Sequence, residues 1–158
     1  MRQNALFQLA TGLGTPGTAR KEDIAIVSPV PLEEERDDHC VVRNGVRCAG
    51  VHLIIDLYEA ERLDDRDHVE QAMRRAVDAS GATLLHIHLH RFEPNGVSGV
   101  AVLAESHISI HTWPEIGYAA LDVFMCGKAN PDACVPVLRE AFRPKTIAVS
   151  ELLRGQGV

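Results

Sequence analysis

Residues 83–91 alternate strictly between apolar side chains and histidines, and this pattern limits the folds open to the chain. The two alternating sets are Leu85, Ile87 and Leu89 on one side and His86, His88 and His90 on the other. Successive side chains of a β-strand point to opposite faces, so the pattern predicts a strand with one buried face and one exposed face. Such a strand belongs in a sheet that is covered on one side only.

The segments before and after this strand predict a mixed chain of helices and strands. An apolar, β-branched run over 52–58 predicts a buried strand. A helix follows, with its core positions at Val69, Ala72, Met73, Ala76 and Val77. We expect it to begin at the capping pair Asp67 and Glu70 and to end at Gly81.

The second half of the chain predicts more strands and one further helix. After a turn at 93–96, three strand-like stretches cover 99–104, 107–112 and 119–126. The helix has Asn130 as its N-cap and should start near Val135, because Pro136 disturbs the first turns. A last strand covers 145–153. The order β-α-β-β-β-β-α-β favours the α+β class, a two-layer sandwich with helices on one face of a mainly antiparallel sheet.

Composition predicts one globular domain. The chain has 158 residues, of which 46% are hydrophobic and 24% charged, and that is enough for a single core. Residues 1–45 are turn-rich and carry the acidic run 33–38, so we expect an extended, partly disordered leader before a domain at 46–158.

Charge and cysteine usage exclude several classes of protein. A net charge of -6 gives no global attraction to nucleic acid or to an anionic membrane. No apolar run reaches the roughly 18 residues of a membrane span, and no secretory signal is recognisable, so we expect a cytoplasmic protein. The four cysteines form no C-x-x-C pair, which predicts free thiols and no zinc site built from cysteines alone.

The densest group of reactive side chains lies in residues 104–115. If 107–112 is a strand, His107, Ser109 and His111 share one face and can converge on a common site. Three interpretations are open: a solvent-facing polar surface, a metal site that uses the imidazoles of His86, His88 and His90, and a serine activated by an imidazole. Ser106 and Ser109 are the candidate nucleophiles, although no G-x-S-x-G elbow surrounds them.

Long motifs in residues 50–155 resemble the bacterial and archaeal type of S-adenosylmethionine decarboxylase. They are the stretch 96–100 (GVSGV), the stretch 105–115 (ESHISIHTWPE) and the stretch 117–127 (GYAALDVFMCG). The resemblance implies a proenzyme that cleaves itself between Glu105 and Ser106 into a β chain of residues 1–105 and an α chain of residues 106–158. It also implies a layered dimer of processed αβ units that needs neither metal nor pyridoxal phosphate.

The resemblance assigns a role to each residue around the cleavage site. Ser106 becomes a covalent pyruvoyl group that forms a Schiff base with the substrate, His111 is the base for processing, and Cys126 is the proton donor. Ser98 supports processing. A serine is needed because its Cβ oxygen takes over the acyl group and then leaves.

The resemblance also implies a substrate site and a product. Phe92 stacks on the adenine with His111 on its other side, and Glu115 holds the ribose hydroxyls. The reaction releases CO2 from S-adenosylmethionine and yields S-adenosylmethioninamine, the aminopropyl donor of spermidine biosynthesis.

Three alternatives remain open from the sequence. Relatives of this family act as pyruvoyl-dependent arginine or ornithine decarboxylases with the same cleavage site. A homologue that has lost processing would act as a regulatory or binding subunit. A metallohydrolase would use His86, His88 and His90, and it would lose activity to a chelator.

Overall fold

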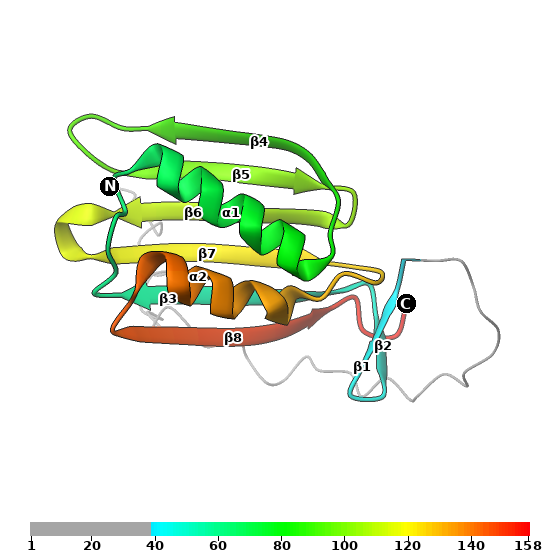
Figure 1. The fold of residues 1–158 in the computed structure, drawn as a ribbon. Coiled ribbons are helices and arrows are strands. Elements are labelled where there is room, and N and C mark those ends of the chain that lie inside the picture. Colours follow the sequence, from blue (N-terminus) through cyan, green and yellow to red (C-terminus); the bar gives the residue numbers. More distant parts are fainter. Residues whose placement is uncertain (1–38) are drawn as a thin grey trace, which may run out of the picture.

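Alternating apolar residues build the inner face of a six-stranded sheet in the computed structural model, which describes residues 39–158 (Figure 1). The strand order is β4-β5-β6-β7-β3-β8, and every pairing between neighbours is antiparallel. The strands are β3 (Gly50–Tyr58), β4 (Leu84–Arg91), β5 (Val97–Leu103), β6 (Ser106–Trp113), β7 (Tyr118–Met125) and β8 (Thr146–Arg154). The predicted antiparallel sheet is confirmed.

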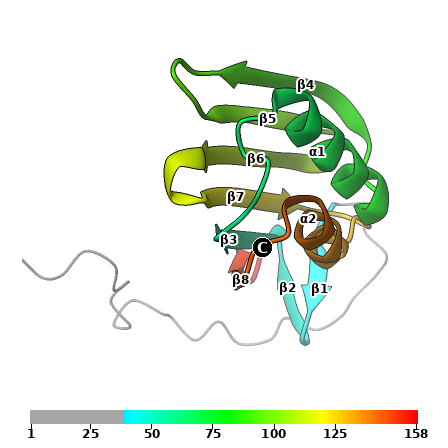
Figure 2. The same cartoon turned by 60° about the vertical axis from the view of Figure 1, so that its left-hand side comes forward.

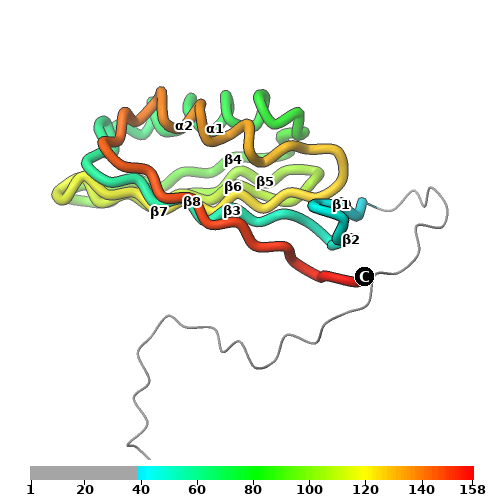
Figure 3. The backbone as a smooth tube through the Cα atoms, turned by 90° about the horizontal axis from the view of Figure 1, so that it is seen from below, coloured from blue at the N-terminus to red at the C-terminus, as the bar shows by residue number. Residues whose placement is uncertain are grey.

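Two helices, α1 (Arg66–Ser80) and α2 (Cys134–Phe142), cover one face of this sheet. Figure 3 shows both helices on the same side of the sheet and none of the described helices on the other side. The predicted arrangement of helices on one face is therefore confirmed. No helix within residues 39–158 is long and apolar enough to cross a membrane.

The core lies between the helices and the sheet. Leu53, Ile55 and Leu57 of β3 are almost completely buried, and Met73 of α1 and Phe142 of α2 are fully buried. Full burial of one such side chain stabilises the fold by roughly 1.5–3 kcal/mol. This apolar layer covers one face of the sheet, so the polar side chains of the strands lie on the opposite face.

The ends of α1 are set by local hydrogen bonds. The carboxylate of Asp65 accepts from the backbone N–H of His68 over 3.0 Å, so Asp65 is the N-cap and the predicted start at Asp67 and Glu70 is wrong. The predicted end is confirmed, because Gly81 adopts φ +71° and its N–H bonds the carbonyl oxygens at the end of the helix.

The second helix begins with a 3-10 turn, η3 (Pro131–Ala133), which the Asn130 side chain caps. The α-helical part starts at Cys134, one residue before the predicted Val135. Pro136 lies in the first turn, where a backbone N–H has no partner within the helix, so the proline is tolerated there.

The strict alternation predicted for 83–91 fails at its first apolar residue. The register of β4 against β5 shifts between Leu84 and His86, so Leu84 packs against the core and Leu85 is 63% exposed. A bulge of this kind moves a side chain to the other face. The rest of the prediction holds, since Leu89 is buried and His86, His88 and His90 are exposed.

A short hairpin precedes the sheet, and the sequence analysis missed it. Strands β1 (Val41–Arg43) and β2 (Val46–Cys48) pair through a turn in which Asn44 and Gly45 both have positive φ. Strand structure therefore begins five residues before the predicted boundary at 46. Residues 1–38 of the predicted leader lie outside the described residues. Figure 2 shows the hairpin near the C-terminal end of the chain.

Candidate functional site

Polar side chains gather on the sheet face that points away from the helices. On β6, Ile108 and Ile110 are buried toward the core, while His107, Ser109 and His111 lie on the other face. The shared face predicted for these three residues is confirmed.

The Glu105–Ser106 peptide lies at the two-residue turn between β5 and β6. Leu103 pairs with Ser106 across this turn. Ser106 has φ +137°, a conformation that residues other than glycine rarely adopt. A backbone held in so sparsely populated a region carries roughly 1–3 kcal/mol of strain. The turn thus places conformational strain at the residue that the sequence identified as the cleavage site.

Hydrogen bonds hold both the side-chain carboxylate and the backbone carbonyl of Glu105. Its carboxylate accepts from the backbone N–H of Thr83 over 2.8 Å and from the Thr83 hydroxyl over 3.2 Å. Its carbonyl oxygen accepts from the backbone N–H of Cys126 over 3.0 Å and from the Cys126 thiol over 3.2 Å. Two donors on one carbonyl oxygen polarise the C=O bond and stabilise the negative charge that a nucleophilic attack would place there.

A second polar group lies toward the other end of β6. The hydroxyl of Ser98 and Nδ1 of His111 lie 2.8 Å apart, as neighbours across β5 and β6. An open cavity of about 370 Å³ surrounds this pair, lined by Phe92, Asn95, Gly96, Ser98, His111, Thr112, Trp113 and Glu115. The structure therefore brings together all four residues that the sequence assigned to substrate binding and processing support.

The loop that carries Phe92 is fastened by Asp64, a residue that the sequence analysis missed. One carboxylate oxygen of Asp64 accepts from Arg91 over 2.7 Å, and the other accepts from the backbone N–H of Gly96 over 2.8 Å. The hydrogen bond from Arg91, followed by that from Gly96, lowers the pKa of Asp64 below its ordinary value. Because these partners are 27 and 32 positions away in the sequence, no local pattern marks Asp64.

The cleavage turn and the Ser98–His111 pair do not meet within one chain. Ser106 is the first residue of β6 and His111 is the sixth. Five steps along a strand, at about 3.3 Å each, separate their Cα atoms by roughly 16 Å. At this separation, His111 does not reach Ser106 of its own chain, so the processing role that the resemblance assigns to His111 stays a prediction.

The cysteines differ in their surroundings. None of the four forms a disulfide within residues 39–158, as the sequence predicted. Cys126 is partly exposed beside the cleavage turn, whereas Cys134 is fully buried, and burial raises the pKa of its thiol to about 12. These environments agree with a reactive role for Cys126 and with the core position predicted for Cys134.

The three exposed histidines of β4 do not form a metal centre in the described chain. Within residues 39–158, no group of three or more histidine, cysteine or carboxylate side chains is arranged to hold a metal ion.

Comparison with known proteins identifies the family. The sequence model of S-adenosylmethionine decarboxylase matches residues 51–155, and the chain belongs to this family. It is 51% identical over 112 residues to the S-adenosylmethionine decarboxylase proenzyme of Thermomicrobium roseum, which covers 70% of this chain and 97% of the relative. The proenzyme of Methanococcus aeolicus is 48% identical over 112 residues, or 69% of this chain and 96% of the relative.

A solved structure agrees with this assignment. The crystal structure of the adenosylmethionine decarboxylase from Aquifex aeolicus matches with a TM-score of 0.63 and 34% sequence identity. The match covers 68% of this chain and 92% of that chain. The family that the motifs predicted is thereby confirmed.

Proposed function

We propose that this protein is a self-processing, pyruvoyl-dependent decarboxylase that converts S-adenosylmethionine to S-adenosylmethioninamine and CO2, a step of polyamine biosynthesis. The observation that carries the proposal is the strained Glu105–Ser106 turn, whose scissile carbonyl accepts two hydrogen bonds from Cys126. The relatives' name as proenzymes supports processing, and the strained backbone of Ser106 supports this turn as its place.

Cleavage begins with the side chain of Ser106. Its hydroxyl oxygen attacks the carbonyl carbon of Glu105, the C–N bond breaks, and the acyl group passes to oxygen as an ester. The N–H and thiol of Cys126 stabilise the charge on the Glu105 oxygen during the attack. A base then removes the Cα proton of Ser106, and the Glu105 carboxylate leaves with the upstream chain. Hydrolysis of the resulting dehydroalanine releases ammonia and leaves a pyruvoyl group.

The residues around position 106 fit such a group. The pyruvoyl carbonyl, once formed, supplies an electrophile for the substrate amine and a sink for the electron pair that CO2 leaves behind. The thiol of Cys126 lies next to the turn and donates a proton to the former α-carbon of the substrate. No pyridoxal phosphate or metal is required by this scheme.

The cavity around His111 fits the nucleoside part of the substrate. Phe92 is 47% exposed and offers a ring face for stacking on adenine, and the carboxylate of Glu115 accepts hydrogen bonds from a vicinal diol. Arginine and ornithine carry neither an aromatic base to stack on Phe92 nor a vicinal diol to bind Glu115, so this pair of residues favours S-adenosylmethionine.

A dimer completes the site. The face that carries both polar groups also exposes large apolar side chains, namely Ile54, Tyr58, Val102, Trp113 and Leu152. Packing this face against the same face of a second copy would bury these side chains and form a layered two-fold dimer. His111 of the partner subunit would then reach Ser106, which lies roughly 16 Å from His111 of its own chain at about 3.3 Å per residue.

The proposal is tested by assay of purified protein with carboxyl-labelled S-adenosylmethionine. Release of labelled CO2 that is absent in a Ser106→Ala variant supports it. Release from labelled arginine or ornithine instead would contradict the substrate, and no release from any of the three would favour a regulatory homologue. Cell fractionation tests the cytoplasmic location, which stays a prediction.

A further inference from the structure

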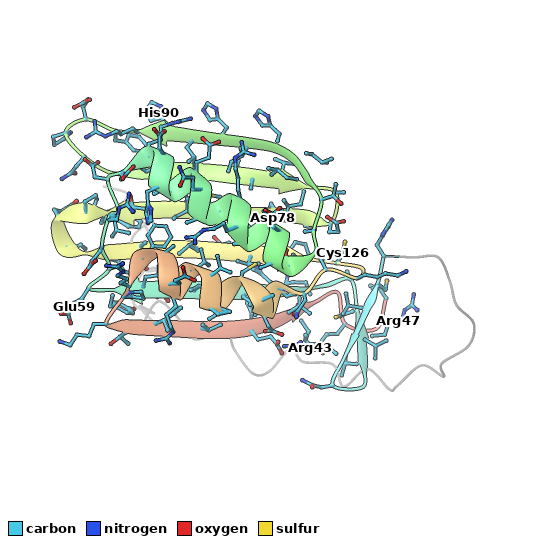
Figure 4. All side chains as sticks on the ribbon, in the orientation of Figure 1. Arg43, Arg47, Glu59, Asp78, His90 and Cys126 are labelled. Atoms are coloured by element: carbon cyan, nitrogen blue, oxygen red, sulfur yellow. The ribbon has the colours of Figure 1, made fainter. Side chains whose placement is uncertain are left out.

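The hairpin β1–β2 lies outside the matched region 51–155, yet His39, two residues before it, contacts the segment that follows Cys126. The backbone N–H of Gly127 donates to the carbonyl oxygen of His39 over 2.7 Å. Figure 4 shows Cys126 and Arg43 at the same end of the molecule, with Glu59 and His90 at the opposite end. The hairpin is therefore placed to influence the cysteine that lies beside the cleavage turn.

Arg43 of β1 fastens the other end of the same segment. Its guanidinium lies 2.7 Å from the carboxylate of Asp132 and also pairs with Glu151 of β8. The hydrogen bond with Glu151, followed by that with Asp132, raises the pKa of Arg43 above its ordinary value. Residues 127–132 are thus held at both ends, by the carbonyl of His39 and by the side chain of Arg43.

Further contacts join the hairpin to the last residues of the chain. The N–H of Gly157 donates to the carbonyl oxygen of Arg47 over 3.0 Å, and Nε of Arg47 donates to the carbonyl oxygen of Val158 over 2.7 Å. Cys48 at the end of β2 is fully buried, which anchors the hairpin to the body of the fold. After cleavage at 105–106, His39 and the hairpin would belong to the β chain. Their partners would belong to the α chain, namely Gly127, Asp132, Glu151, Gly157 and Val158.

We propose that the hairpin β1–β2 is a clasp that positions the thiol of Cys126, with Arg43 as a positioning residue. The clasp also adds contacts between the two products of self-cleavage to those of the shared sheet, in which β3 pairs with β7 and β8 and β5 pairs with β6. The clasp between the two chains rests on the proposed function, because it requires the cleavage. The contacts between the hairpin and the segment after Cys126 exist in the uncleaved chain, so the positioning can be tested without cleavage.

The test measures alkylation of Cys126 by iodoacetamide in a Ser106→Ala background, with the modified cysteine located by peptide mass. Arg43→Ala should raise the rate of Cys126 alkylation about fivefold. This is the change expected when the free energy of local opening around Cys126 falls by about 1 kcal/mol. Arg43→Lys keeps the charge and should stay near the parent rate. Arg74→Ala is the matched control, because it removes another arginine–glutamate pair, with Glu70 on α1, far along the chain from the clasp.

Two results would overturn the positioning role: an unchanged rate at Cys126 in Arg43→Ala, or an equal rise in Arg74→Ala. If Arg43→Ala does not fold, Asp132→Asn removes one partner of Arg43 and should raise the rate in the same direction. In the chain that retains Ser106, Arg43→Ala should cleave, keep its KM for S-adenosylmethionine and lose kcat. Failure of the parent to cleave would contradict the proposed function, whereas an unchanged alkylation rate would contradict only the clasp.

Discussion

The strain at Ser106 predicts an unusual order of stability between two uncleavable variants. Ser106→Ala and Ser106→Gly both lose the attacking hydroxyl, so both remain single chains. At φ +137°, alanine keeps a backbone strain of roughly 1–3 kcal/mol, which glycine does not carry. Glycine in a strand costs about 0.5–1 kcal/mol of extra conformational entropy. The glycine variant should therefore be the more stable by about 1 kcal/mol, which raises Tm by about 2–4 °C in a chain of this size.

Ser109 supplies the matched control for this comparison. It lies on the same strand without a positive φ, and its hydroxyl bonds Asp122 over 3.1 Å, a contact that both substitutions remove. In the Ser106→Ala background, Ser109→Gly should be less stable than Ser109→Ala by about 0.5–1 kcal/mol, the ordinary order. Urea and thermal unfolding measure all four proteins. If Ser106→Gly is no more stable than Ser106→Ala while the Ser109 pair behaves as expected, the backbone at 106 is not strained.

Three further predictions concern the chemistry. Cys126→Ala should still cleave, more slowly than the parent, and should lose most of its kcat; a cleaved variant with full turnover would remove Cys126 from the decarboxylation. Asp64→Asn should raise the KM for S-adenosylmethionine and leave cleavage intact, because Asp64 fastens the Phe92 loop. Because the pKa of Asp64 is lowered, its hydrogen bonds to the loop are present at neutral pH and are lost only as the pH falls through the folded-state pKa. The KM of the parent should therefore rise in acid, whereas the KM of Asp64→Asn should not change with pH for this reason. Co-expression of Ser106→Ala with His111→Ala should let roughly half of the His111→Ala chains cleave, because roughly half of randomly formed two-fold dimers are mixed; no cleavage would contradict a site completed by the partner.

The helices and strands of the main sheet were predictable because their apolar residues repeat at helical or strand spacing over many positions. The bulge at Leu84 and the cap at Asp65 were not, since both depend on backbone geometry that the period of hydrophobic residues does not encode. The hairpin at 41–48 was missed because a three-residue strand is too short for a period to be recognised. Its Asn44–Gly45 dipeptide was the available signal.

The sequence motifs propose residues for the site, but they do not predict how far apart the fold places them. The motifs place Glu105, Ser106 and His111 within seven positions of one another, and Cys126 follows 20 positions after Ser106. An extended strand separates residues that are five positions apart by roughly 16 Å, at about 3.3 Å per residue, so closeness in sequence did not mean closeness in space. Asp64 escaped notice for the opposite reason, since its partners are distant in sequence and adjacent in the fold.

The most direct test of the central claim is the intact mass of freshly purified protein under denaturing conditions. Self-cleavage predicts two chains, 1–105 and 106–158, in place of one of 17.3 kDa. The smaller chain should resist N-terminal sequencing and weigh about 17 Da less than the same sequence with an N-terminal serine, because ammonia has been lost. A single uncut chain, or a smaller chain that still begins with serine, would contradict the account.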